Sequence, residues 1–178
     1  LGNHLQDCFI SWSDSKRTLV FAIEYFTAHR VLRKNMELAN AYKKIKEELV
    51  LGRQLYVICP RIDEPDPTKE LAIQAKSVKE EAKRLKKDVF SEYEIEILHS
   101  KMKAADKEKV MLDYKAKKID ILVATSVVEV GVNVENASLI IIEGAERFGL
   151  AQLHQLRGRV IRSNYQAYCF VFTESQGD

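Results

Sequence analysis

One short segment near the end of the sequence combines residue types that bind phosphate. In the run QLRGRVIR, Gln155, Arg159 and Arg162 fall in one narrow sector of a helix that turns about 100° per residue. Guanidinium groups donate paired hydrogen bonds to phosphate oxygens, and Gly158 leaves room beside them for a partner surface. The pattern predicts a phosphate-facing helix, but a solvated basic helix face has the same pattern.

A second group of polar residues directly follows a predicted buried strand. In ATSVVEVGVN, Thr125 and Ser126 place hydroxyl and backbone N–H donors where the chain leaves that strand. Such donors bind phosphate without selecting a base sequence. Gly131 allows a tight turn or a close backbone approach, and Asn133 offers an amide to a sugar hydroxyl. An ordinary strand-to-helix turn would explain the same residues.

Two more polar segments also follow predicted strands. His99, Ser100 and Lys101 come at the end of the first, where the serine and lysine could touch a nucleic-acid backbone. A core histidine bonded to the backbone is the other explanation for His99. The second segment, EGAERFG over residues 143–149, is either a coupling loop or a connection in which Phe148 anchors the next helix.

Several catalytic motifs are absent from the sequence. It contains no GxxxxGK[ST] phosphate loop, no GxGxxG after a first strand, no GxSxG and no HExxH. Phosphate-facing groups without a phosphate loop predict one half of a two-part site.

The elements that position these groups alternate along the chain. Strands are expected over residues 54–59, 94–99, 120–125, 138–143 and 167–173, and helices up to about residue 49 and over 68–87, 104–117 and 151–162. Nearly continuous runs of Ile, Val and Leu predict strands buried on both faces. The fold class is therefore α/β, an open, mostly parallel sheet with helices on both faces. Because ligands bind at the carboxyl ends of such strands, all the polar segments are expected to converge there.

The first residues have a less regular pattern. We expect residues 1–34 to form a leader or extension, in which residues 18–25 could be an added strand, residues 35–174 to form the main domain, and residues 175–178 to form a tail.

Composition limits the class of protein. The net charge is only +2, so any nucleic-acid surface must be local. Cys59 and Cys169 lie in apolar runs and are expected to be reduced, buried thiols, and no cysteine or histidine cluster predicts a metal site. No apolar stretch approaches membrane-spanning length. A reducing, cytoplasmic setting without a membrane partner is expected.

These motifs resemble the second RecA-like motor domain of superfamily-two helicases. Three family motifs are matched. The first is matched by Gln155, Gly158, Arg159 and Arg162. The second is matched by Thr125 and Gly131, and the third by Leu98, His99 and Met102. Within the superfamily, the segment EGAERFGLAQLHQLRGRVIR is similar to the RecG family of ATP-dependent DNA branch-migration helicases. The related transcription-repair coupling factors share most of it.

The resemblance implies a site shared between two domains. ATP with Mg²⁺ would be held mainly by the first RecA-like domain of the same parent chain, and branched or forked DNA would be the other partner. The implied catalytic residues are Arg159 and Arg162, as arginine fingers, and Gln155; the implied nucleotide contacts are Gly131, Asn133 and both arginines. The implied DNA-backbone contacts are Thr125, Ser126, His99, Ser100 and Lys101. Alone, the chain should not hydrolyse ATP.

The sequence departs from the family pattern at three positions. The family usually has glycine at positions 161 and 100 and aspartate at 133, where this chain has Ile161, Ser100 and Asn133. Two alternatives therefore stay open, a domain of a transcription-repair coupling translocase and a non-catalytic DNA-binding module that kept the fold.

Overall fold

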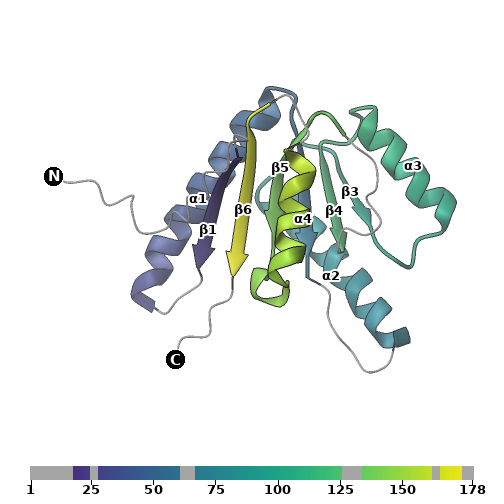
Figure 1. The fold of residues 1–178 in the computed structure, drawn as a ribbon, viewed down its shortest axis with the longest axis horizontal. Coiled ribbons are helices and arrows are strands. Elements are labelled where there is room, and N and C mark those ends of the chain that lie inside the picture. The colour runs from purple at the N-terminus through teal and green to yellow at the C-terminus, as the bar shows by residue number, and fades with distance from the viewer. Residues whose placement is uncertain (1–17, 25–27, 61–66, 126–133, 162–164, 174–178) are drawn as a thin grey trace.

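A computed structural model describes residues 18–24, 28–60, 67–125, 134–161 and 165–173. Within these ranges the chain forms one six-stranded sheet in the order β1-β6-β5-β2-β4-β3, and every pairing is parallel. The arrows of β1, β6, β4 and β3 accordingly point toward the same edge of the sheet in Figure 1. The strands are β1 (Thr18–Glu24), β2 (Gln54–Cys59), β3 (Ile95–Leu98), β4 (Ile121–Thr125), β5 (Ala137–Ile142) and β6 (Ala167–Thr173).

Helices cover both faces of the sheet. Buried residues of α1 (Ala28–Val50) and α2 (Pro67–Asp88) pack on one face, and those of α3 (Ala104–Lys115) and α4 (Leu150–Val160) pack on the other. The short 3₁₀ helix η2 (Ala145–Arg147) joins β5 to α4. The connections through α1 and α2 lead toward the β3 edge of the sheet and cross one face. The connections through α3 and α4 lead toward the β1 edge and cross the opposite face, as right-handed crossovers require. The predicted fold class is confirmed.

The core consists of two apolar layers separated by the sheet. Along β2, Tyr56 and Ile58 face the α3 and α4 layer, whereas Leu55 and Val57 face the α1 and α2 layer. All residues of β2, β4 and β5 are buried. This burial on both faces explains why these strands appear in the sequence as continuous apolar runs rather than alternating patterns.

The observed bounds mostly follow the sequence predictions. β2 and β6 have the predicted limits, and the strand considered over residues 18–25 is β1, which pairs with β6. The predicted boundary between residues 34 and 35 falls inside α1, and the division of the chain into domains remains a prediction. α4 ends at Val160, two residues before the predicted end of the helix.

A buried glutamine ties the start of β2 to the end of α3. The Gln54 amide nitrogen donates hydrogen bonds to the carbonyl oxygens of Tyr114 and Ile119, each at 2.7 Å. Because Gln54 is 2% exposed, these bonds replace water for the last carbonyls of the helix and its connection.

A residue in the left-handed conformation follows each of the helices α1 and α3. It is a glycine after α1 and a lysine after α3. Gly52, two residues after the end of α1, has φ 77°, and Lys117, two residues after the end of α3, has φ 60°. After α3, the N–H groups of Lys117 and Lys118 donate to the carbonyls of Tyr114 and Asp113 at 3.1 and 3.0 Å, which is a Schellman motif. A lysine therefore occupies a left-handed position that favours glycine.

Replacing Lys117 by glycine is expected to raise the free energy of unfolding by about 1 kcal/mol, because glycine adopts positive φ without a Cβ clash. The matched control is Lys115→Gly in the last helical turn, which should lower the free energy of unfolding by about 1 kcal/mol. Urea denaturation measures both. Equal losses of stability in the two variants would contradict the argument.

Candidate functional site

Helix α4 presents the polar residues that the sequence singled out. It begins after Gly149, whose N–H donates to the Gln152 side-chain oxygen at 3.0 Å. Leu156 and Val160 are buried against the sheet and fix the rotation of the helix. As a result Gln155 is exposed and Arg159 is half-buried beside it.

The end of α4 lies at the opposite edge of the sheet from its start. Because β5 and β6 are parallel, the helix between them must run from the carboxyl edge back to the amino edge. Burial raises the pKa of the Tyr56 hydroxyl on β2, and the nearby Arg159 guanidinium opposes part of that rise. The expectation that all polar segments converge at the carboxyl ends is therefore wrong for Arg159.

The residue after α4 does not crowd this face. Ile161 continues in right-handed helical geometry at φ −71° and packs against the core cluster beneath α4. Arg162, the second predicted finger, lies outside the described residues.

At the carboxyl edge, the structure brings together the ends of β3 and β4. Leu98 pairs with Ala124, so His99 and Thr125 follow side by side. Both are largely buried, at 7% and 8% exposure, and the burial of His99 agrees with the core-histidine alternative. Ser100 is half-buried and Lys101 is exposed in the following turn, where the Met102 N–H donates to the His99 carbonyl at 3.1 Å. Ser126, Gly131 and Asn133 lie outside the described residues.

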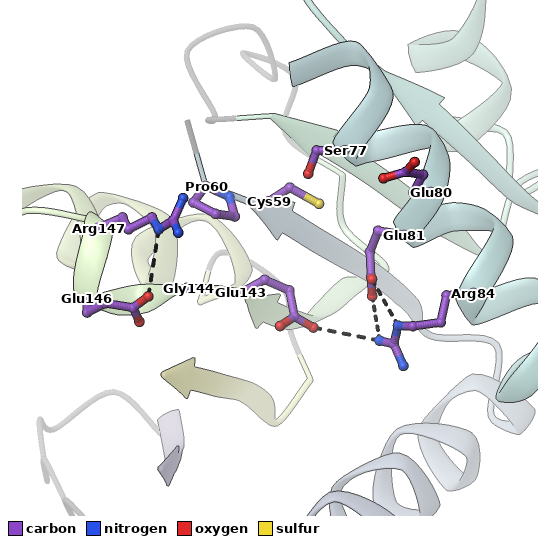
Figure 2. Close-up of a pocket in the computed structure, with 10 residues that line it drawn as sticks. All are labelled: Cys59, Pro60, Ser77, Glu80, Glu81, Arg84, Glu143, Gly144, Glu146 and Arg147. Atoms are coloured by element: carbon purple, nitrogen blue, oxygen red, sulfur yellow. Dashed lines mark hydrogen bonds and ion pairs between the residues drawn. The ribbon is translucent and has the colours of Figure 1, made fainter. Parts of the chain in front are cut away.

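A third polar region lies at the carboxyl ends of β2 and β5. The connections after these neighbouring strands leave across opposite faces of the sheet, which is the topological switch point where open α/β sheets bind ligands. An open cavity of about 470 Å³ lies here (Figure 2). Its lining residues are Cys59, Pro60, Ser77, Glu80, Glu81, Arg84, Glu143, Gly144, Glu146 and Arg147.

Arg84 is the centre of an ion network at this cavity. Its guanidinium donates to both carboxylate oxygens of Glu81, with the Nε bond at 2.9 Å, and to the Tyr42 hydroxyl at 3.1 Å. Nη2 of Arg84, which donates to both Tyr42 and Glu81, lies 3.9 Å from a carboxylate oxygen of Glu143 (Figure 2). The hydrogen bonds to Glu81 raise the pKa of Arg84, and burial raises the pKa of Tyr42. The network links α1, α2 and the end of β5.

The loop after β5 is fixed by its backbone as well. The Glu143 N–H donates to the Ile58 carbonyl at 2.9 Å, which attaches the loop to β2. Gly144 has φ 58°, and a Cβ on it would lie 3.0 Å from Cγ of Pro60. Glycine is needed here for its conformation and for its size.

The sequence did not identify Arg84, Glu81 or Glu143 as a cluster. The spacing of Glu81 and Arg84 indicates a helical ion pair, and Glu143 follows a buried strand. Their meeting depends on α2 packing beside the end of β5, which is a tertiary contact that local spacing does not encode.

Other site types find little support in the part of the chain that the structure describes. No cluster of three or more His, Cys, Asp or Glu residues able to hold a metal occurs among the described residues. Cys59 and Cys169 are buried free thiols, and burial raises the pKa of Cys169 to about 12, so its thiol is protonated at neutral pH. None of the described helices is long and apolar enough to cross a membrane.

Comparison with known proteins identifies the class. Residues 40–164 match the family model of the helicase conserved C-terminal domain, and the chain therefore belongs to that family. The parallel sheet covered by helices is the RecA-like fold of such domains.

Within this class the chain is similar to RecG, as its motifs predicted. It is 43% identical over 137 residues to the ATP-dependent DNA helicase RecG of Synechocystis sp. and 40% identical over 137 residues to that of Thermotoga maritima. Each match covers 77% of this chain but 16% and 17% of the relatives, so the chain spans about one sixth of their length.

Solved structures give the same result. A structure of RecG bound to a three-way DNA junction is 34% identical with a TM-score of 0.63, covering 90% of this chain and 18% of that chain. The yeast DEAD-box splicing factor Prp28, at 14% identity and a TM-score of 0.58 over 92% of this chain and 30% of that one, shares the fold alone.

Gly144→Ala is expected to destabilise the chain by about 2 kcal/mol or more, because it adds a clash with Pro60 to the cost of positive φ. Gly52→Ala is the matched control, since Gly52 has φ 77° but a Cβ on it would meet no atom within 4 Å. That variant should lose about 1 kcal/mol. Thermal or urea unfolding compares them, and equal losses would show that Pro60 yields without cost.

Proposed function

We propose that the chain is the second motor domain of an ATP-dependent DNA helicase or translocase that acts on branched DNA. The observation that carries this proposal is the 40–43% identity to RecG helicases over 137 residues, beside the match of residues 40–164, which include α4, to the helicase conserved C-terminal domain. Its relatives act as much longer chains, so activity would require the remaining domains of a longer enzyme. The predicted cytoplasmic location is part of the same proposal.

The nucleotide side of the proposal rests on α4. Gln155 and Arg159 offer amide and guanidinium donors on a helix whose rotation is fixed by buried neighbours, and this donor set fits the phosphates of ATP. Arg159 and Arg162 would act as arginine fingers on the γ-phosphate, where a positive group stabilises the charge that develops during hydrolysis. Gly131 and Asn133 would lie near the ribose. The bound Mg²⁺ would neutralise phosphate charge, and the first motor domain would hold it.

The DNA side of the proposal rests on the ends of β3 and β4. Lys101 offers an exposed ammonium donor there, and the buried Ser100 hydroxyl and the buried Thr125 lie beside it at the same edge of the sheet. Such groups bind the phosphate backbone and do not select a base sequence. Ser126 would extend this contact, and the buried His99 would support the turn that carries Ser100 and Lys101.

Among the described residues, Arg159 lies toward the amino edge of the sheet and Lys101 at its carboxyl edge, and α4 runs from the carboxyl edge toward the amino edge. Closure of the two motor domains on ATP would press on the end of the helix that carries Arg159. Because the start of α4 lies at the DNA edge, a small rigid movement of the helix would reach the DNA contacts. This arrangement would couple hydrolysis to movement along DNA.

Arg159→Ala in the full-length protein is expected to lower DNA-stimulated ATP turnover by about 10³-fold or more, because the transition state loses a positive charge. DNA binding should persist, since Arg159 lies away from the β3 and β4 ends. The measurement is steady-state ATP hydrolysis with forked, linear duplex and no DNA.

The matched control is Lys87→Ala, which removes an exposed positive charge near the end of α2, on the face of the sheet opposite α4. Its turnover should stay near that of the wild type. Stimulation by linear duplex as strong as that by forks would favour a transcription-repair coupling translocase. A wild-type protein that binds DNA but hydrolyses no ATP would leave the non-catalytic binding module as the function.

Lys101→Ala is expected to weaken binding of the chain to forked DNA about threefold to tenfold and to reduce the salt dependence by about one phosphate contact. Lys87→Ala is the matched control, because Lys87 is an exposed lysine near the end of α2, at the opposite edge of the sheet. Fluorescence anisotropy at several salt concentrations measures both. An equal effect of the two variants would mean that binding is a general charge effect.

A further inference from the structure

The network around Arg84 lies at the start of the segment that joins β5 to α4. Glu143 is the first residue after β5, and residues 144–149 separate it from the start of α4. That segment contains η2, and its Phe148 packs against the core beneath α4. Any displacement of Glu143 is therefore transmitted through a short, packed connection to the helix that carries Arg159.

Two of the attachments of Glu143 to its surroundings differ in kind. Its N–H bonds the Ile58 carbonyl at 2.9 Å, which fixes its backbone to β2. Its carboxylate faces Arg84 of α2 at 3.9 Å (Figure 2). The second attachment is an ion pair and not a hydrogen bond, because 3.9 Å exceeds hydrogen-bond distance and the two Nη2 hydrogens of Arg84 are donated to Glu81 and Tyr42. A modest movement of the loop therefore changes the strength of this attachment.

The Arg84 guanidinium is itself held in place. Glu81 binds it through two nitrogen atoms, and the Tyr42 hydroxyl accepts a third hydrogen bond. The Arg84, Glu81 and Glu143 side chains are 39%, 18% and 19% exposed, so the carboxylates are more shielded from water than those of a surface pair. Arg84 therefore offers Glu143 a fixed positive group rather than a flexible one.

We propose that Arg84 is a positioning residue for the arginine-bearing helix α4, and that it acts through Glu143. The inference rests on the proposed function for its catalytic consequence but not for its structural one. Arg84 sets the position of the segment after β5, and thereby the position of Arg159 at the far end of α4. Substitution of Arg84 should change ATP turnover rather than nucleotide binding, because Arg84 lies at the carboxyl edge of the sheet and Arg159 lies toward the amino edge.

The first test uses the chain alone and hydrogen–deuterium exchange. Glu143→Gln keeps the size of the side chain and removes its charge, and Arg84→Lys keeps the charge and removes the planar fork. Both should raise exchange rates about threefold to tenfold over residues 143–156 and leave β2 and β4 unchanged. Glu80→Gln is the matched control, because Glu80 lines the same cavity but pairs at 3.7 Å with Lys76.

The second test measures turnover by the full-length protein with forked DNA. Glu143→Gln and Arg84→Lys should lower kcat about threefold to tenfold with KM for ATP unchanged, and the double variant should lose no more than the stronger single one. Glu80→Gln should match the wild type.

The two tests separate the positioning role from the proposed function. Exchange that rises over residues 143–156 without any change in kcat would overturn the positioning role, and so would exchange that rises equally in all strands. A wild-type protein without DNA-stimulated turnover would instead contradict the proposed function, while the exchange result would still report on the attachment of Glu143.

Discussion

The parallel pairing of every described strand is the constraint on which the rest of the structure depends. Parallel neighbours cannot be joined by tight turns, so each connection crosses a face of the sheet and returns to the starting edge. The crossing helices cover both faces, and the strands in between must be apolar on both sides. The continuous runs in β2, β4 and β5 are the result.

The same constraint separates the two polar regions of the proposed motor. Strand ends must lie at the carboxyl edge, which places Lys101 and Thr125 together. A crossing helix must end at the amino edge, which carries Arg159 away from them. The separation is therefore a property of the topology. The separation lets the proposed motor bind its energy source and its track at the same time without overlap.

Much of this arrangement could be predicted from the sequence because it depends on local patterns. Apolar runs identified the strands, helical spacing identified the helices, and α1 ends at Val50, next to the expected limit at about residue 49. The position of Arg159 was predicted wrongly, because angular periodicity tells which side of a helix a residue occupies but not toward which edge of the sheet that helix runs. The Arg84 network could not be predicted, since its members come from three elements that meet only after folding.

The charge at the topological switch point bears on where DNA can lie. Among the described residues that line that cavity, the four carboxylates of Glu80, Glu81, Glu143 and Glu146 outnumber the two guanidinium groups of Arg84 and Arg147, so this lining is acidic. A phosphate backbone is repelled there and attracted to Lys101 at the neighbouring strand ends. The place that most α/β sheets use for a ligand is thus taken by an ion network that holds Glu143. For the proposed function, this confines the DNA track to the β3 and β4 side and leaves the β2 and β5 side to support α4.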